Sequence, residues 1–181
     1  MKKYIALLRG INVSGQKKIL MADLKNLMLE LNFENIHTYI QSGNIIFDFI
    51  DVNFKILENQ ISEKIKLKFG FDVVIIVKTP SEIESAITKN PFLKDVTKEL
   101  NKIYVVFLSE KPASNYINLL DNVDYSPEEF IIDDNIIYFY APYGAGNSKL
   151  STIFFEKKLN VNATARNWNT VNKLLKLSKK N

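Results

Sequence analysis

The spacing of apolar residues along the chain alternates between the period of a strand and the period of a helix. Tyr4 to Leu8 is a short apolar run typical of a buried strand, and a loop follows from Arg9 to Lys18. Apolar residues then recur on one face of a helix, at Leu20, Leu24, Leu27, Met28 and Leu31. The chain therefore opens with a strand, a loop and an amphipathic helix.

The next segment predicts two strands, a second helix and a further strand. Residues 36–40 and 44–49 read as strands joined tightly through Gln41-Ser42-Gly43, and a helix follows from about Phe54 to Gly70. Residues 71–78 form a β-branched strand. The order strand, helix, strand, strand, helix, strand is the split βαβ, or ferredoxin-like, motif.

That topology predicts which loops meet. Its first and third strands are adjacent and antiparallel, so the end of the first strand lies beside the start of the third. We therefore expect Arg9 and Asn12 to lie near Gln41, Ser42 and Asn44.

After residue 78 the order begins again. Thr79-Pro80-Ser81-Glu82 is a capping box with proline at the first helical position, and it opens a connector helix that Asn90-Pro91 ends. The pattern then predicts a strand at 103–108, a helix at 113–120, a hairpin of 130–132 with 136–140, and a helix over 150–159. This second unit lacks a clear last strand and ends in the helix after Arg166.

The predicted fold class is α+β. A ferredoxin-like (split βαβ) unit spans residues 1–78, and a similar but modified α+β unit spans 79–181, with the connector helix and basic C-terminal helices. The pattern leaves open whether the two units share one sheet.

Composition narrows the chemistry. The sequence has no Cys, which excludes disulfides and thiol catalysis, and a single His, His37, which disfavours a His-based metal site or triad. The apolar run before Arg9 is too short for an export signal, and no segment approaches the length of a membrane span. We therefore expect a cytoplasmic protein with no membrane partner, no metal and no cofactor.

Charge is distributed unevenly. Residues 1–20 carry five Lys or Arg and no acid, and residues 141–181 carry eight and one acid, whereas the segment between them has eleven basic residues and nineteen acids. Basic ends that meet would favour an anionic partner. The alternative is a set of solvated lysines on a helix and a tail.

Three stretches are candidates for a site. The first is the glycine-containing loop Tyr140 to Lys149, where Ser148 at a helix start and Lys149 could cradle a phosphate. It has neither the P-loop spacing nor the dinucleotide fingerprint. The alternative is a glycine turn with Ser148 as helix N-cap.

The second candidate is formed by the loops of the first unit. Arginine pairs with carboxylates and phosphates in two-point geometry, and amides suit polar edges. The alternative is that the polar side chains satisfy hairpin backbone groups and that Arg9 pairs with an acid. The residues are Arg9, Asn12, Lys17, Lys18, Gln41, Ser42 and Asn44.

The third candidate runs from Thr164 to Thr170. Thr164 or Asn167 can cap the last helix, and Trp168, Val171, Leu174 and Leu175 can form its buried face. That structural interpretation leaves Arg166 and Asn169 unexplained, which favours a binding site.

Catalysis has no clear signature. His37 stands alone, and Asp133 and Asp134 are adjacent in a tight turn, where they do not converge on one substrate. Tyr4, Phe47 and Phe49 are placed as in an RNA-recognition sheet, but the RNP1 pattern is absent and these rings are expected in the core. Whether the protein is an enzyme stays open.

Six stretches together resemble the domain of unknown function 1697 family of small bacterial proteins. They are Ala6-Leu-Leu-Arg-Gly-Ile-Asn-Val13, Met21-Ala-Asp-Leu24, Thr38-Tyr-Ile-Gln-Ser-Gly-Asn44, Asn90-Pro-Phe92, Ser148-Lys-Leu150 and Thr164-Ala-Arg-Asn-Trp-Asn-Thr170. The resemblance implies an α+β fold with ferredoxin-like parts in a small cytoplasmic protein, and no established activity.

The sequence thus predicts an anionic ligand, bearing phosphate or carboxylate, at a polar site between the two units. Nucleic-acid binding through the basic ends and an enzyme acting on a phosphorylated small molecule are the alternatives, and the ligand and the oligomeric state stay open. The predicted ligand-binding residues are Arg9, Asn12, Gln41, Ser42, Asn44, Ser148, Lys149, Arg166, Asn167 and Asn169.

Overall fold

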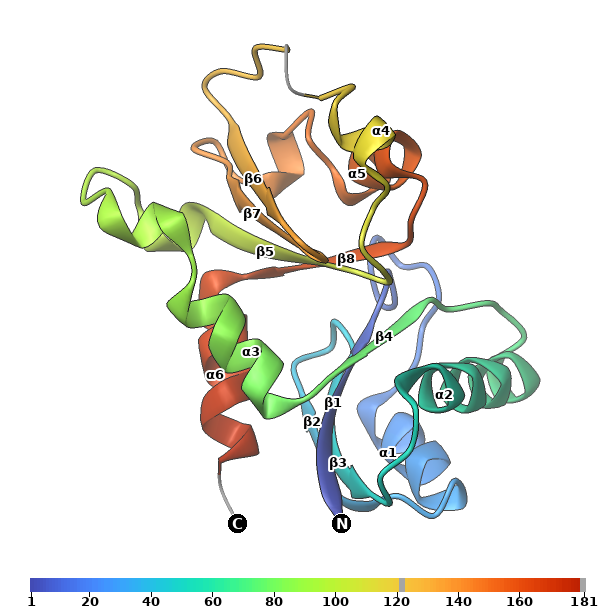
Figure 1. The fold of residues 1–181 in the computed structure, drawn as a ribbon. Helices are drawn as coiled ribbons and strands as arrows, with labels where there is room; N and C mark the ends of the chain where they lie inside the picture. The colour runs from blue at the N-terminus through green and yellow to red at the C-terminus, as the bar shows by residue number, and fades with distance from the viewer. Residues whose placement is uncertain (121–122, 180–181) are drawn as a thin grey trace. The chain divides into compact units, whose positions relative to one another are not determined.

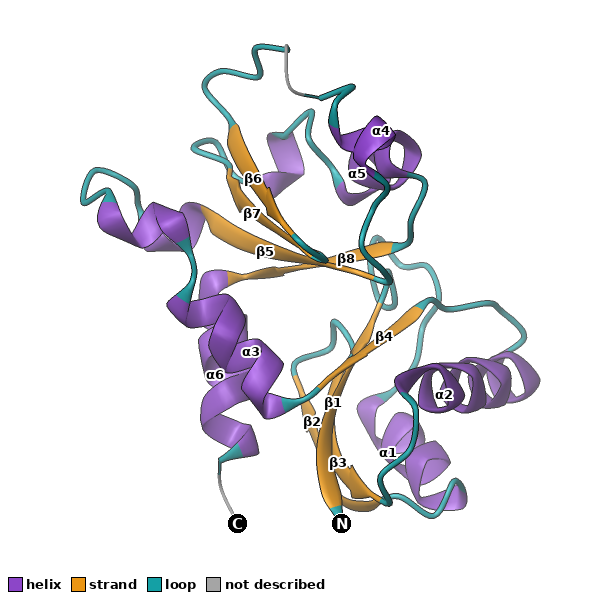
Figure 2. Cartoon of the chain, viewed as in Figure 1, coloured by secondary structure: helices purple, strands orange, loops and turns teal. Residues whose placement is uncertain are grey.

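The computed structural model describes residues 1–120 and 123–179, and the chain divides into two compact units. The first unit comprises Met1–Glu84 and Leu174–Asn181, and the second comprises Ser85–Lys173. Each contains helices and an antiparallel sheet of its own (Figure 2). The α+β class is therefore confirmed, and the two units have separate sheets.

The first sheet has four strands in the order β2-β3-β1-β4, and all neighbours are antiparallel. Helices α1 and α2 lie on one of its faces (Figure 1). This is the ferredoxin-like arrangement that the sequence predicts. The elements are β1 (Lys2–Leu8), α1 (Met21–Glu30), β2 (Glu34–Tyr39), β3 (Asn44–Phe49), α2 (Phe54–Phe69) and β4 (Ile75–Lys78).

The core of the first unit lies between this sheet and its two helices. Tyr4 and Phe47 are fully buried in it, and their rings stack at 5.6 Å between centroids. Phe33 stacks on Phe47 at 4.5 Å. Because Tyr4 and Phe47 face the helices, they form no open stacking surface for bases, and their expected place in the core is confirmed.

Local signals set the helix ends in the first unit. Gly70 ends α2 in the left-handed conformation, at φ 79°, as predicted. The capping box before α3 (Pro80–Thr88) is also confirmed, because the Thr79 N–H donates to Glu82 Oε2 at 2.8 Å and the Glu82 N–H donates to Thr79 Oγ1 at 3.3 Å.

The second sheet repeats the topology of the first, with the order β6-β7-β5-β8. Its strands are β5 (Ile103–Leu108), β6 (Glu129–Asp133), β7 (Ile136–Tyr140) and β8 (Ala163–Asn167), and its helices are α4 (Ser114–Ile117) and α5 (Thr152–Leu159). Short 3₁₀ turns occupy Pro91–Lys94, Leu100–Lys102 and Ala145–Asn147. Helix α6 (Trp168–Ser178) follows β8 directly.

The expectation that the second unit lacks a last strand was wrong. Ala163–Asn167 forms β8, which pairs antiparallel with β5 from Leu108↔Ala163 to Tyr104↔Asn167. The segment carries small and polar side chains instead of an apolar run, so its strand conformation depends on pairing with β5 and has no local signature.

Two helix predictions in the second unit also needed correction. The helix expected over 150–159 begins at Thr152, and the one expected over 113–120 is regular only over Ser114–Ile117. The core of this unit includes Val106, Phe139 and Phe155. Within the described ranges, no helix has both the length and the apolar character that crossing a bilayer requires.

Candidate functional site

The loops of the first unit come together as predicted. Leu7 pairs with Asn44 across β1 and β3, and the Leu8 N–H donates to the Gly43 carbonyl at 2.8 Å. Asn12 reaches the same place, because its Nδ2 donates to the Gln41 carbonyl at 2.9 Å. The loop after β1 is therefore joined to the turn between β2 and β3.

Asn12 holds this loop closed. Its Oδ1 accepts from the Ile19 N–H at 2.9 Å, and its Nδ2 donates to the Ile19 carbonyl at 2.9 Å as well as to Gln41. Both amide hydrogens are thus used within the fold. Its φ of 56° is a left-handed value that asparagine tolerates better than most residues.

Asn44 and Ser42 stabilise the turn itself. Asn44 is buried, and its Nδ2 donates to the Tyr39 carbonyl at 3.0 Å and to Ser42 Oγ at 3.1 Å. These bonds match the structural alternative for the two residues, in which they satisfy hairpin groups. Arg9, which is half-buried, donates its backbone N–H to the Val74 carbonyl at 2.9 Å.

A cleft of about 540 Å³ opens between this loop, the first turn of α1 and the end of α2. One part of its wall is polar and another part is apolar. It is lined by Asn12, Gly15, Lys18, Ile19, Leu20, Met21, Asp23, Gln41 and Phe69. Leu20, the residue before α1, supplies no side-chain cap, so the first backbone N–H groups of the helix receive no bond from it.

Three polar side chains of this cleft take no part in the fold. Lys18 and Gln41 are exposed and Asp23 is half-buried. Within residues 1–120 and 123–179, none of these three side chains makes a hydrogen bond or an ion pair. A cation, an amide and a carboxylate that the fold does not need therefore line one cavity.

Sequence reasoning found only part of this cleft. Asn12 and Gln41 were predicted ligand contacts, and Lys18 was placed in the same loops, but Asp23 and Phe69 were missed. The missing cap at Leu20 was a usable signal, since an apolar residue at that position leaves helix N–H groups open. Phe69 gave no signal, because it lies far along the chain from the other residues that line the cleft.

The glycine loop of the second unit lacks the helix start that was predicted at Ser148. Ser148 caps no helix, since its Oγ accepts from the Leu150 N–H at 2.9 Å and α5 begins only at Thr152. Ser151 is the N-cap of α5 and accepts from the Phe154 N–H at 3.2 Å. Lys149 is exposed between them.

The motif before the last helix is built into strand β8. Arg166 is buried, and its Nη1 donates to Thr164 Oγ1 and to the Ala165 carbonyl, each at 2.8 Å. Burial lowers the pKa of Arg166 to about 10. Asn167 caps α6, as the structural alternative predicts, by accepting from the Thr170 N–H at 2.8 Å.

Tyr138 shares a sheet face with Arg166. Val105 pairs with Tyr138 on one side and with Arg166 on the other, so the three side chains project from the same face. The buried Tyr138 hydroxyl has no hydrogen-bond partner among the described residues, and burial raises the pKa of Tyr138 to about 12.

The predicted residues are thus divided between the two units. Arg9, Asn12, Gln41, Ser42 and Asn44 belong to the first and lie around one loop and one turn. The second unit holds Ser148, Lys149, Arg166, Asn167 and Asn169, of which Asn167 and Asn169 are exposed. In the part of the chain that the structure describes, no three His, Asp or Glu side chains gather as metal ligands would.

Comparison with known proteins assigns the chain to a family. The model for "Protein of unknown function (DUF1697)" matches residues 1–138, and the chain belongs to that family. Among solved structures, the chain is similar to that of the conserved bacterial protein SP0830 from Streptococcus pneumoniae. The TM-score is 0.76 at 22% sequence identity, and the match covers 98% of each chain. Comparison with curated proteins finds no match.

Proposed function

We propose that the protein binds a small molecule bearing a phosphate or carboxylate group in the cleft of the first unit. The observation that carries the proposal is that the cleft's exposed polar side chains are not used by the fold. Lys18 offers an ammonium with three donors, and Gln41 offers an amide in the same cleft. The volume of about 540 Å³ lies within the range of small-molecule sites, about 300 to 1,000 Å³.

The other predicted residues of this unit would then position the cleft. Asn12 closes the loop that carries Lys18, and Asn44 with Ser42 stabilises the turn that presents Gln41. The open N–H groups at the start of α1 add a weak positive end to the same cavity. The proposal assigns no ligand contact to Lys149 or Arg166 of the second unit.

A thermal-shift screen against nucleotides, sugar phosphates, carboxylates and a short RNA tests the proposal. A ligand at about a hundredfold its dissociation constant stabilises the folded state by roughly 2.7 kcal/mol. We expect one class of small anion to raise the melting temperature, and Lys18→Ala to reduce the rise without lowering the melting temperature of the free protein.

Lys25→Ala is the matched control. Lys25 is exposed on the same helix α1 but does not line the cleft, so removing it changes the net charge equally and should leave the shift intact. A shift of the same size in Lys18→Ala as in the wild type, or a screen in which no small anion stabilises the protein, would refute the proposal. Stabilisation by RNA alone, weakening steeply as salt rises, would favour the nucleic-acid alternative.

A further inference from the structure

The cleft of the first unit holds an acid as well as a base. Asp23 lines it from the first turn of α1, together with Lys18. Among the described residues the two form no ion pair with each other or with a third group. A ligand that carries only a negative charge would pair with Lys18, but the carboxylate of Asp23 would repel it.

The rest of the wall is apolar. Ile19, Leu20, Met21 and Phe69 line the same cavity. Leu20 is 72% exposed, although it is a large aliphatic residue, and Phe69 is half-buried at the end of α2. Apolar side chains that stay open beside a cavity favour a ligand with an apolar body.

We infer that the ligand of the proposed site is a small amphipathic zwitterion of the amino-acid or dipeptide type. This inference rests on the proposed function and specifies its ligand. The ligand carboxylate pairs with Lys18 and accepts from the Gln41 amide, and its ammonium pairs with Asp23. Its apolar side chains lie against Leu20, Met21 and Phe69. In this arrangement every unused side chain of the cleft has a partner of matching chemistry.

Calorimetric titration with three related probes tests the inference. L-leucyl-L-phenylalanine carries both charges, its N-acetyl derivative lacks the ammonium, and its C-terminal amide lacks the carboxylate. We expect the dipeptide to bind most tightly and each derivative to bind roughly three- to tenfold more weakly, the scale for a charge-assisted contact at a partly open site.

Two protein variants match the two derivatives. Asp23→Asn should weaken the dipeptide by the same factor and leave the N-acetyl derivative unchanged or tighter. Lys18→Gln should weaken the dipeptide and leave the amide derivative unchanged. Lys25→Gln, on the exposed side of α1, should change none of the three affinities. Melting temperatures of the variants measured without ligand separate lost binding from lost folding.

The outcomes separate the inference from the proposed function. If the N-acetyl derivative binds as tightly as the dipeptide, and Asp23→Asn strengthens the binding of both, the inference of a zwitterionic ligand is wrong. The proposed anion site then stands. The same holds if none of the three probes binds but a phosphate compound binds in a Lys18-dependent way. If neither the probes nor any anion binds, both the inference and the proposed function are overturned.

Discussion

Gly43 occupies a position in the first unit that no side chain fits. It lies in the turn between β2 and β3 with φ +78°, and a Cβ added there would be 2.6 Å from Leu8 Cβ and 2.9 Å from Ile11 Cδ1. Leu8 Cβ is fixed to the backbone of the buried strand β1 and cannot rotate away. Gly43→Ala therefore combines left-handed strain of about 1–2 kcal/mol with overpacking of about 1–3 kcal/mol.

Gly70→Ala is the matched variant that carries the left-handed strain alone, so the difference between the two variants measures the overpacking at Gly43. Gly70 has nearly the same φ, +79°, but nothing lies within 4 Å of an added Cβ, so only the strain of about 1–2 kcal/mol applies. Urea unfolding followed by circular dichroism measures both variants, and we expect Gly43→Ala to lose about 2–5 kcal/mol in total. If both variants lost the same free energy of unfolding, with the slope of that free energy against urea concentration unchanged, the proposed overlap with Leu8 and Ile11 would be refuted.

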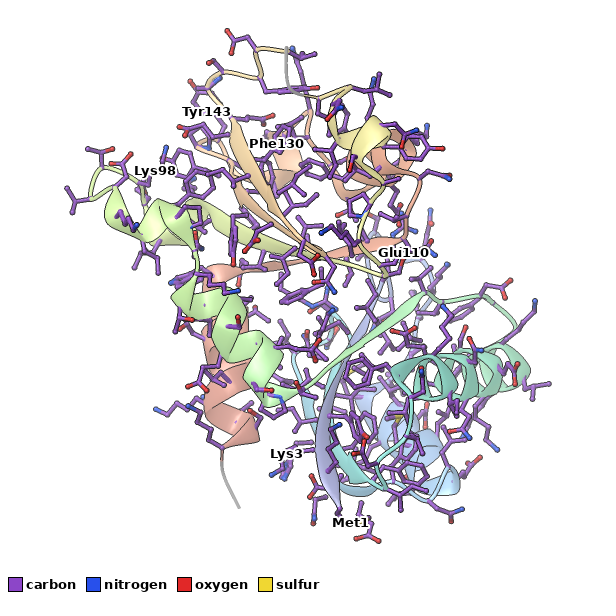
Figure 3. All side chains as sticks on the ribbon, in the orientation of Figure 1. Met1, Lys3, Lys98, Glu110, Phe130 and Tyr143 are labelled. Atoms are coloured by element: carbon purple, nitrogen blue, oxygen red, sulfur yellow. The ribbon has the colours of Figure 1, made fainter. Side chains whose placement is uncertain are left out.

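Two predictions concern the second unit. Tyr138→Phe removes a buried hydroxyl that has no partner among the described residues, so the free energy of unfolding should stay unchanged or rise by up to about 1–2 kcal/mol. Because burial raises the pKa of Tyr138 to about 12, ionisation of this residue leaves the free energy of unfolding unchanged below pH about 10 and lowers it as the pH rises towards 12. Urea titrations at several alkaline pH values should show that loss in the wild type and not in Tyr138→Phe, and a clearly less stable variant at neutral pH would contradict this account. The second prediction concerns Lys98, which is labelled in Figure 3. Its Nζ lies 4.4 Å from the ring centroid of Tyr140 and 5.2 Å from the ring centroid of Phe92. The same ammonium forms an ion pair with Glu129. Lys98→Met should lower the free energy of unfolding by about 1–2 kcal/mol in urea, and a loss indistinguishable from zero would show that these contacts stabilise nothing.

The order of elements in the ferredoxin-like first unit could be predicted from local signals, although β4 begins at Ile75 and not at residue 71 as predicted. The capping box at Thr79 and the stop at Gly70 are set within a few residues, and the structure has both. Strand β8 has no such signal. Its alternation of small and polar residues, from Ala163 to Asn167, acquires strand conformation only through pairing with β5, a partner more than fifty positions earlier in the chain.

The candidate site was predictable only as far as topology determines it. Antiparallel pairing of β1 with β3 brings Asn12 to Gln41, and that proximity is confirmed. The use of both Asn12 amide hydrogens within the fold follows from the path of the loop to Ile19, which no sequence pattern specifies. The same is true of Phe69, which reaches the cleft only because α2 ends beside α1.

The most direct test of the binding site is a map of backbone amide shifts in isotopically labelled protein, titrated with the tightest small anion or zwitterion from the binding experiments. The proposed site predicts saturable shift changes that cluster at Gly15, Lys18, Met21 and Gln41. In the Lys18→Ala variant, the same ligand concentrations should produce smaller shift changes. Shifts confined to residues 140–149 and 163–170 would place the ligand in the second unit and contradict the account.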